Sequence, residues 1–259
     1  MTHHGRFIWY ELITTDLEAA SRFYEDVVGW THDDMVGEEM TYRVLSANGD
    51  GNELGGMLVI PPEAAAQGAP PSWSGYICVD DCDAAAKKID GLGGRVIRAP
   101  QDIPGIGRFA VVADPQGAVF AIMKPFPMET ERPEIPQGTL GHTSWHELYT
   151  TDLESGLAFY SEMFGWKKED TMDMGEMGPY VLFANQDGSI GGMMRKPAEL
   201  PGSAWLFYFE VGDIDAAKDR IERGGGQAIN APMEVPGGHW IVQAVDPQGA
   251  MFAVTGRKG

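Results

Sequence analysis

The chain carries the same sequence pattern twice, and this duplication constrains its fold more strongly than any other feature. Residues 9–30 align with residues 145–166 at an offset of 136, and 12 of these 22 aligned positions are identical. Later features recur at an offset of 132, such as Asp-Pro-Gln-Gly-Ala, which begins at Asp114 and again at Asp246. Because the matches keep their order through both halves, the chain is predicted to contain two copies of one structural unit.

Each half is predicted to contain strands and helices in the same order. Residues 7–14 have the pattern of a strand, and Thr15 with Glu18 forms a capping box at the start of a helix. Apolar residues then recur every three or four positions up to Gly29, which suits the left-handed end of a helix. Strand patterns follow at 31–35, 41–47 and 54–60, before a second round with a strand at 73–79 and a helix at 83–90. The chain is therefore predicted to be an α+β protein of four βαβββ units.

Proline marks the boundary between the two halves. The stretch 125–141 holds few residues suited to a core and contains Pro125, Pro127, Pro133 and Pro136. This composition favours extended backbone. We therefore expect a first domain at 1–124, a proline-rich linker at 125–141 and a second domain at 142–259.

The charge balance argues against several classes of partner. The chain has 19 basic and 38 acidic residues, a formal net charge of −19, which repels nucleic acid and anionic membranes. No segment approaches the roughly 20 apolar residues that span a bilayer. Cys78 and Cys82 are the two cysteines, too few for a disulfide framework in a chain of 259 residues. We expect a cytoplasmic protein, monomeric or homodimeric, with a small-molecule ligand and neither nucleic acid nor membrane as partner.

The repeated motifs resemble those of a known superfamily. In both halves Asp-Leu-Glu opens the first helix, Phe-Tyr and Gly-Trp follow it, and Asp-Pro-Gln-Gly-Ala precedes the last strand. This order resembles the vicinal oxygen chelate superfamily, which includes glyoxalase I, the fosfomycin and bleomycin resistance proteins and the extradiol dioxygenases. The resemblance implies two tandem glyoxalase-like domains with cupped mixed sheets. It does not fix the function, since the superfamily spans lyases, isomerases, transferases, dioxygenases and drug-binding proteins.

The resemblance also implies where a metal would be held. Enzymatic members bind a divalent metal through His, Gln or Glu on the first strand of a unit and Glu on its last strand. The matching positions here are Trp9 and Trp145 on first strands, and Ala121 and Ala253 on last strands. Indole and methyl groups offer such a metal no ligand atom. For the other ligand positions, alignment with the family gives Ser74, Leu206 and the Gly-Gly-Met stretches 55–57 and 191–193. We expect no metal or other cofactor at this site, with a divalent metal held by shifted residues as the alternative.

Strand alternation places the expected site residues on shared faces, because residues two apart point the same way. The catalytic candidates are the carboxyl and phenol side chains Glu147, Tyr208, Glu11 and Tyr76. The substrate-binding candidates are Trp9, Ile13, Trp145, Tyr149, Glu210, Met57, Met193, Arg108 and His239. Aromatic walls around a carboxylate would raise its pKa, so Glu11 or Glu147 could act as a general acid or base. The alternative is that the repeated Trp-x-Glu-Leu only packs the fold.

Two histidines four residues apart offer a second metal hypothesis, which strand geometry disfavours. On a strand, His142 and His146 would be separated by about 13 Å. His146 is also predicted to lie on the face opposite Glu147.

The sequence favours a metal-independent protein that binds or transforms a small hydrophobic or aromatic metabolite. One alternative is a metal-dependent lyase, isomerase or dioxygenase of the same superfamily. Another is a non-catalytic protein that sequesters a small molecule. The sequence leaves open whether the protein only binds its ligand or also transforms it in a reaction of the lyase, isomerase or hydroxylase type.

Overall fold

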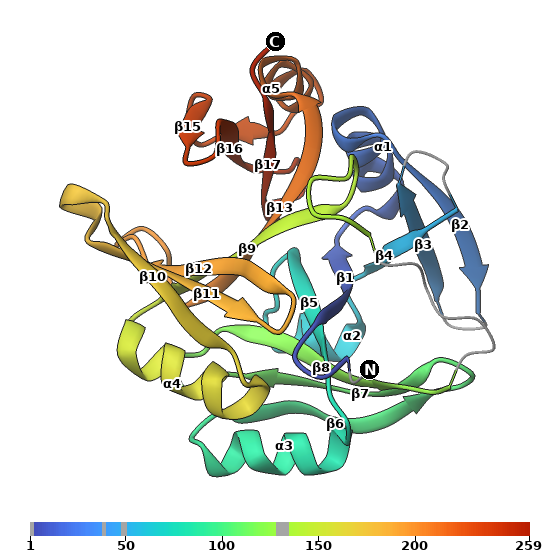
Figure 1. Ribbon diagram of the computed structural model, residues 1–259. Helices are drawn as coiled ribbons and strands as arrows, with labels where there is room; N and C mark the ends of the chain where they lie inside the picture. The colour runs from blue at the N-terminus through green and yellow to red at the C-terminus, as the bar shows by residue number, and fades with distance from the viewer. Residues whose placement is uncertain (1–2, 38–39, 48–50, 128–134) are drawn as a thin grey trace. The chain divides into compact units, whose positions relative to one another are not determined.

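The computed structural model describes residues 3–37, 40–47, 51–127 and 135–259. They form four βαβββ modules with mixed sheets, so the predicted α+β class is confirmed (Figure 1). Part of the expected linker, including Pro133, lies outside the described residues. Its first residue, Pro125, is the last residue of a strand, and its other described parts, 126–127 and 135–141, contain no helix or strand.

Modules 1 and 2 come from the first half of the chain. Module 1 consists of β1 (Phe7–Thr14), α1 (Leu17–Val28), β2 (Trp30–Val36), β3 (Thr41–Ala47) and β4 (Glu53–Val59). The short helix α2 (Pro62–Ala66) follows. Module 2 consists of β5 (Ser72–Cys78), α3 (Cys82–Gly91), β6 (Arg95–Ile103), β7 (Gly107–Ala113) and β8 (Val119–Pro125). Strand order is β2-β3-β4-β1 in module 1 and β5-β8-β7-β6 in module 2.

Modules 3 and 4 repeat this plan in the second half. Module 3 consists of β9 (Thr143–Thr150), α4 (Leu153–Phe164), β10 (Lys167–Asp173), the 3-10 turn η1 (Gly175–Met177), β11 (Pro179–Asn185) and β12 (Gly188–Arg195). Module 4 consists of β13 (Ala204–Asp213), α5 (Ile214–Arg223), β14 (Gln227–Ala228), β15 (Met233–Val235), β16 (His239–Val245) and β17 (Met251–Arg257). Strand order is β10-β11-β12-β9 and β13-β17-β16-β14, with β15 paired to β16. In each module the first and last strands are parallel neighbours.

The modules group into two compact units that cut across the halves of the sequence. The 2–3 unit comprises Met1–Ile8, Ser74–Glu131 and Trp145–Trp205, which covers modules 2 and 3. The 1–4 unit comprises Trp9–Trp73, Arg132–Ser144 and Leu206–Gly259, which covers modules 1 and 4. Helix α1 packs against α5 in the 1–4 unit, and α3 packs against α4 in the 2–3 unit (Figure 1).

The first helix of each half begins one residue later than the capping box predicted. Asp16 is the N-cap of α1, and its carboxylate accepts a hydrogen bond of 2.9 Å from the Ala19 amide. Asp152 caps α4 in the same way. Thr15 with Glu18 was therefore the wrong pair, because Asp is as good an N-cap as Thr and stands one position closer to the helix. The predicted end is confirmed, since Gly29 has a left-handed φ of 89°.

A buried tyrosine lies at the centre of the aromatic core in the 1–4 unit. Tyr24 is fully buried and stacks on Trp30 with 5.4 Å between ring centroids. Its hydroxyl donates to Asp246 Oδ2 at 3.1 Å and accepts from Trp73 Nε1 at 2.8 Å. The other carboxylate oxygen of Asp246 accepts from the amides of Gln248 and Ala250, each at 2.9 Å. One aspartate thus fixes the turn before β17 and satisfies a buried phenol.

The 2–3 unit has the same core built from the matching residues. Tyr160 donates to Asp114 Oδ2 at 3.1 Å and accepts from Trp205 Nε1 at 3.1 Å. Trp166 stacks on Tyr160 with centroids 5.3 Å apart. Burial is the main cause that raises the pKa of the Asp114 and Asp246 carboxyls. The repeated Phe-Tyr, Gly-Trp and Asp-Pro-Gln-Gly-Ala motifs therefore meet in the cores of the two units.

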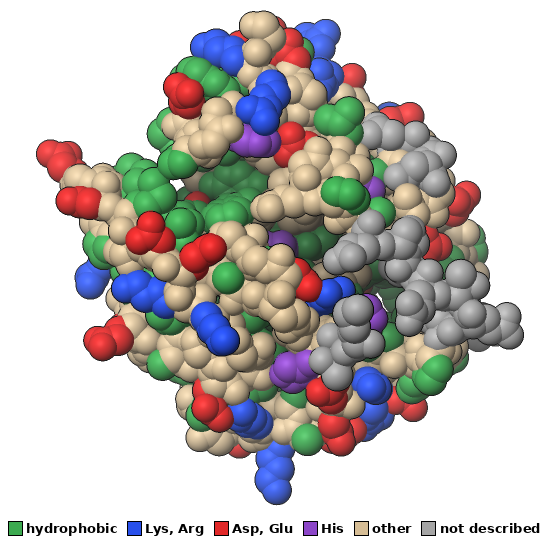
Figure 2. All heavy atoms as spheres, viewed as in Figure 1, with side chains coloured by type: hydrophobic (Ala, Val, Ile, Leu, Met, Phe, Trp, Pro, Cys, Tyr) green, Lys and Arg blue, Asp and Glu red, His purple; other side chains and the backbone are tan. Residues whose placement is uncertain are grey.

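The surface reflects the acidic composition. Figure 2 shows acidic side chains distributed over the viewed face, including the tip of the β10–β11 hairpin. Among the described residues, no helix has the length and hydropathy needed to cross a membrane.

We expect Tyr24→Phe and Tyr160→Phe each to lower the free energy of unfolding by about 1–3 kcal/mol, because a buried aspartate and a buried indole N–H both lose a partner. Urea denaturation followed by circular dichroism measures this loss. The exposed Lys87 serves as the control, and Lys87→Gln should change stability by less than about 0.5 kcal/mol. Tyrosine variants as stable as the wild type would contradict this account of the core.

Candidate functional site

The first strand of module 1 has one face covered by its helix and one face turned away from it. Leu12 is fully buried and aligns with Met57 of β4. Met57 in turn contacts the Ser21 hydroxyl of α1, with 3.8 Å between Sδ and Oγ. Because side chains alternate along a strand, Trp9, Glu11 and Ile13 lie on the opposite face.

On that opposite face, three side chains form a hydrogen-bonded chain that we name the module 1 triad. Trp9 Nε1 donates to the Tyr42 hydroxyl at 2.8 Å. Tyr42 donates to Glu11 Oε2 at 3.1 Å. Tyr42 comes from β3, so the triad connects the first and third strands of the module across β4.

Module 3 contains the same arrangement, the module 3 triad. Trp145 Nε1 donates to the Tyr180 hydroxyl at 2.8 Å, and Tyr180 donates to Glu147 Oε2 at 2.9 Å. Glu147 is 5% exposed, whereas Glu11 is only half-buried. A tyrosine thus joins each predicted pair, Trp9 with Glu11 and Trp145 with Glu147. Neither Tyr42 nor Tyr180 was predicted from the sequence.

Glycine makes room for each of these tyrosines. Gly56 pairs with Glu11 between β4 and β1, and Gly192 pairs with Glu147 between β12 and β9. A Cβ atom at Gly56 would overlap the ring and hydroxyl of Tyr42, and one at Gly192 would overlap Tyr180. The glycines of the Gly-Gly-Met stretches therefore have a structural role. They let the tyrosine ring lie across the last strand of the module, so that its hydroxyl reaches the glutamate carboxylate.

Burial and charge keep both phenols protonated. Desolvation is the main cause that raises the pKa of Tyr42, and the nearby negative charge of Glu11 raises it further. The pKa of Tyr180 lies well above its usual value for the same two reasons, with Glu147 as the charge. Each tyrosine accordingly acts as a hydrogen-bond donor to its glutamate.

Module 4 presents a different polar face. Tyr208, Ala253 and Gln243 are neighbours in register across β13, β17 and β16. Gln243 Nε2 donates to the Tyr208 hydroxyl at 2.8 Å. The resemblance gave the position of Ala253 to a metal-binding glutamate. Here the strand that carries Ala253 lies between the strands of Tyr208 and Gln243, whose side chains are hydrogen-bonded to each other.

Glu210 lies two residues beyond Tyr208 on the same face and is 5% exposed. It accepts a hydrogen bond of 2.8 Å from the Ser144 hydroxyl. Burial raises the pKa of Glu210, while the Ser144 bond and the positive charges of His239 and Arg257 oppose the increase. Strand alternation puts His239 on the face of Gln243, so the predicted trio Tyr208, Glu210 and His239 does share one face.

Module 2 is more apolar at the matching positions. Tyr76 is buried and stacks with Phe109 at 6.1 Å between centroids. Burial raises the pKa of the Cys78 thiol to about 11, which makes it a weak nucleophile. Arg108 alternates with Phe109 and points to the helix side, where it donates to Asp83 and Asp102 at 2.6 and 2.8 Å.

The remaining predicted binding residues divide between the two faces. Ile13 shares the face of Trp9, and the buried Tyr149 shares the face of Trp145. Met57 and Met193 are fully buried against the helix-covered side, aligned with Leu12 and Leu148. These methionines, predicted to bind substrate, do not share a face with the triads.

The residues present do not fit the divalent metal that the resemblance implied. Four of its ligand positions are occupied by Trp9, Trp145, Ala121 and Ala253. The last-strand positions of modules 1 and 3 fall in the Gly-Gly-Met stretches 55–57 and 191–193. Within the described parts of the chain, no group of three or more His, Cys, Asp or Glu is arranged to hold a metal ion. Each triad also offers a single carboxylate, which is less than a metal site needs.

His146 has a structural partner on the helix-covered side of β9. Its Nδ1 lies 2.7 Å from the Ile190 carbonyl oxygen, and its ring stacks on Phe7 at 4.0 Å. Burial lowers the pKa of His146 to about 4, so the ring is neutral at physiological pH and donates its Nδ1–H.

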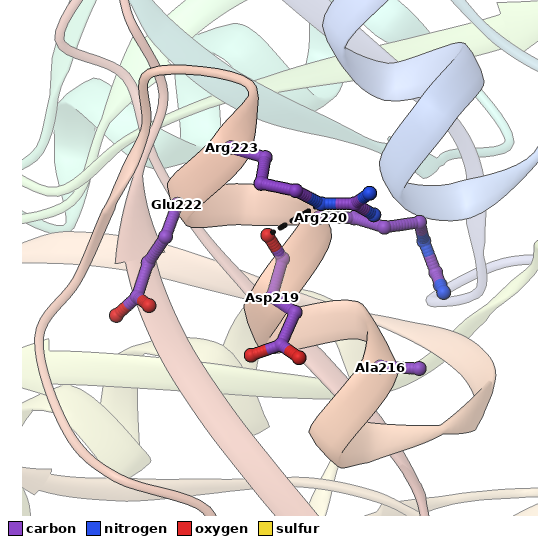
Figure 3. A pocket seen from close by; sticks show the side chains of 5 residues that line it. All are labelled: Ala216, Asp219, Arg220, Glu222 and Arg223. Atoms are coloured by element: carbon purple, nitrogen blue, oxygen red, sulfur yellow. Dashed lines mark hydrogen bonds between the residues drawn. The ribbon is translucent and has the colours of Figure 1, made fainter.

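A surface depression on α5 is a weaker candidate. It is lined by Ala216, Asp219, Arg220, Glu222 and Arg223, all from one helix (Figure 3). Arg220 donates to the Val27 carbonyl at 2.9 Å, and Arg223 donates to the Asp219 carbonyl at 3.3 Å. The matching helix α3 has different residues at four of these five positions, so the depression is not part of the repeat.

Comparison with known proteins gives one family across both halves. The profile described as Glyoxalase/Bleomycin resistance protein/Dioxygenase superfamily matches residues 6–122 and again residues 139–254. A Mycobacterium tuberculosis protein named "Putative glyoxylase CFP32" is 33% identical over 248 residues, which cover 95% of this chain and 92% of that protein. The anthracycline biosynthesis protein DnrV of Streptomyces peucetius is 30% identical, with 96% and 92% covered.

Solved structures show the same fold at low sequence identity. The Mn(II)-bound glyoxalase from Novosphingobium aromaticivorans superposes with a TM-score of 0.63 at 15% identity, covering 100% of this chain and 83% of that one. Homoprotocatechuate 2,3-dioxygenase from Arthrobacter globiformis superposes with a TM-score of 0.68 at 16% identity, covering 98% and 80%.

The glycine–tyrosine pairing predicts a non-additive double mutant. Gly192→Ala should destabilise the protein by about 1–3 kcal/mol, because the new methyl group displaces the Tyr180 ring. In Gly192→Ala/Tyr180→Ala the loss should be smaller than the sum of the two single losses by more than about 0.5 kcal/mol. Urea denaturation of the four proteins completes the cycle, and Gly202→Ala, where nothing lies near the added Cβ, is the control. Strict additivity would show that the two side chains do not compete for the same space.

The His146 imidazole predicts a pH dependence of stability. Its pKa falls from 6.5 when unfolded to about 4 when folded, so between these values the unfolded chain binds more protons. The stability it contributes is present above pH 6.5 and is lost as the pH falls towards 4, by up to about 3 kcal/mol. Unfolding of wild type and His146→Gln at pH 7 and pH 4.5 measures this difference. The wild type should lose more stability than the variant, and an equal loss would contradict the assignment.

Proposed function

The chain belongs to the Glyoxalase/Bleomycin resistance protein/Dioxygenase superfamily, and from this premise we propose that it binds or transforms a small hydrophobic or aromatic metabolite at its Trp–Tyr–Glu triads without a metal there. The observation that carries the proposal is the recurrence of the same two hydrogen bonds in modules 1 and 3. A packing residue can be replaced by any side chain of similar volume, whereas a retained hydrogen-bonded chain preserves polar chemistry.

The composition of these faces supports an aromatic or hydrophobic ligand. Trp9 and Trp145 are half-buried, so each indole offers part of its surface to a ligand. Ligand sites are commonly built from such aromatic surface with a small number of polar groups. Glu11 and Glu147 supply the polar groups here, and Tyr42 and Tyr180 hold them in position.

The relatives support the same class of ligand. Two of them, from Streptomyces, are named anthracycline biosynthesis proteins, and anthracyclines are compounds with fused aromatic rings. Another relative carries a glyoxylase name. These names belong to those proteins, and they favour a small organic molecule for this chain.

The triads also support the absence of a metal at the usual positions. A phenol that donates to a buried carboxylate stabilises its charge in place of a cation. The alternative is a metal-dependent lyase, isomerase or dioxygenase that draws its ligands from other residues. Metal content and binding in the absence of metal distinguish the two.

Turnover, where it occurs, would be carried by Glu147. It is the more buried triad glutamate, and Tyr180 fixes one of its oxygens. A positioned carboxylate of this kind can accept or return a proton in a lyase or isomerase reaction. Binding without turnover would instead make the protein a sequestering module. A cytoplasmic location and a monomeric or homodimeric state stay predictions from the sequence.

We predict that protein treated with a chelator and dialysed binds a fused-ring hydroxylated probe, 1-naphthol, with unchanged affinity in isothermal titration calorimetry. Trp145→Ala and Glu147→Gln should each weaken binding about tenfold, the loss of a stacking or hydrogen-bond contact worth about 1.4 kcal/mol. Asp219→Asn, in the depression on α5, is the matched control and should bind as the wild type does.

Two results would contradict the proposal. One is binding that disappears with metal removal and returns on addition of Mn²⁺, Zn²⁺, Ni²⁺ or Fe²⁺ in stoichiometric amount. The other is binding that is unaffected by both Trp145→Ala and Glu147→Gln.

A further inference from the structure

We propose that a line of four side chains across the module 3 sheet is a second ligand-contacting surface beside the triad, and that it makes module 3 prefer fused-ring aromatic ligands to single rings. This line, which we name the module 3 row, consists of Met172 on β10, Tyr180 on β11, Met194 on β12 and Tyr149 on β9. The row belongs to the site of the proposed function, so the preference rests on that function and names its ligand class.

Strand register places the four side chains of the row in one line. Strands β10, β11, β12 and β9 are successive neighbours in the sheet (Figure 1). Met172 is the partner of Tyr180 between β10 and β11. Continued by one position, the antiparallel register of β11 and β12 puts Tyr180 opposite Met194. Met194 is in turn the partner of Tyr149 between β12 and β9. Because directly paired residues project from the same face of a sheet, the whole row lies on the face of the triad.

The row is wide, and most of it keeps accessible surface. Met172, Tyr180 and Met194 are half-buried, and Tyr149 is 4% exposed. Neighbouring strands lie about 4.8 Å apart, so three strand spacings give the row a width of about 14 Å. A single benzene ring covers only part of that width, whereas several rings fused in a line contact most of it.

The Tyr180 ring does not cover the methionine opposite it. A Cβ atom at Gly192 would meet the ring and the hydroxyl of Tyr180, so the ring lies over Gly192, two positions before Met194 on β12. The Met194 thioether therefore lies beside the phenol. A flat ligand can contact both side chains at once.

The side chains of the row suit a flat aromatic ligand. Methionine is unbranched and adapts its shape to a neighbour, and its polarisable sulfur makes favourable contacts with aromatic rings. The phenol ring of tyrosine adds an aromatic surface. In the module 3 row the two kinds of side chain alternate, so each ring of a fused system finds a thioether or an aromatic partner.

Module 1 has the matching row with different side chains. It consists of Met35, Tyr42, Leu58 and Ile13. The edge methionine and the tyrosine are the same in both rows, whereas leucine and isoleucine take the places of Met194 and Tyr149. Leu58 is 6% exposed, so it offers a ligand little surface. The preference for fused rings is therefore assigned to module 3, with Met172 and Met194 as the specificity-determining residues.

Three alcohols with one, two and three rings test the row: benzyl alcohol, 2-naphthalenemethanol and 2-anthracenemethanol. Equilibrium dialysis measures their dissociation constants. In Met172→Ala/Met194→Ala, which shortens two side chains of the row and leaves the triad intact, the three-ring alcohol should bind about tenfold more weakly than it binds to the wild type. Benzyl alcohol should change by less than about twofold, which also shows that the variant is folded. Met40→Ala, at an exposed position outside both rows, is the matched control and should bind all three as the wild type does.

The outcomes separate the row from the proposed function. If Trp145→Ala weakens binding, but the double alanine variant binds the three-ring alcohol as the wild type does or loses the same factor for all three alcohols, the ligand site stands and the row is refuted. If Met35→Ala/Leu58→Ala causes the selective loss and the module 3 variant does not, the assignment to module 3 is refuted. If none of the alcohols binds, both the ligand site and the row are refuted.

Discussion

A hydrogen bond between a buried tyrosine and a buried aspartate determines how the modules of this protein associate. A phenol removed from water must find a partner, and Tyr24 finds it in Asp246 while Tyr160 finds it in Asp114. In each case the two residues come from opposite halves of the chain and lie in one compact unit. The aspartate also closes the turn before the last strand, so the same carboxylate positions the strand that carries Ala253 or Ala121.

This interaction explains why the order of strands and helices could be predicted from the sequence, while the pairing of modules into compact units could not. Periodicity and turn residues act over a few positions, so the strands and helices given bounds in the first half lie within one or two residues of their observed bounds, whereas the short helix α2 was not predicted. The pairing of modules depends on which phenol reaches which carboxylate, across 222 residues for Tyr24 and 46 for Tyr160. The repeated motifs contain both partners, but two identical tyrosines and two identical aspartates do not specify which pairs form.

The site was predicted in part for a related reason. Trp9 with Glu11 and Trp145 with Glu147 follow from alternation within one strand. Tyr42 and Tyr180 come from β3 and β11, which are separated from β1 and β9 by one strand. They match at an offset of 138 and lie in the sequence between the block aligned at an offset of 136 and the block aligned at 132, so the repeat alignment did not reveal them. A signal was present in the Gly-Gly-Met stretches. Glycine in a strand interior often marks a place where another group approaches closely, and here that group is the tyrosine ring.

The two halves preserve one part of this chemistry and vary another. Both triads keep the same three side chains and the same glycine beneath the phenol. Modules 2 and 4 keep Tyr76 and Tyr208, yet Val111 in one corresponds to Gln243 in the other, and Cys78 corresponds to Glu210. After a duplication, chemistry that both copies need is retained in both, whereas residues that adjust each copy to its own ligand are free to diverge. Under the proposed function, the triads therefore supply the recognition that both copies share, and the apolar face of module 2 and the polar face of module 4 supply what distinguishes them.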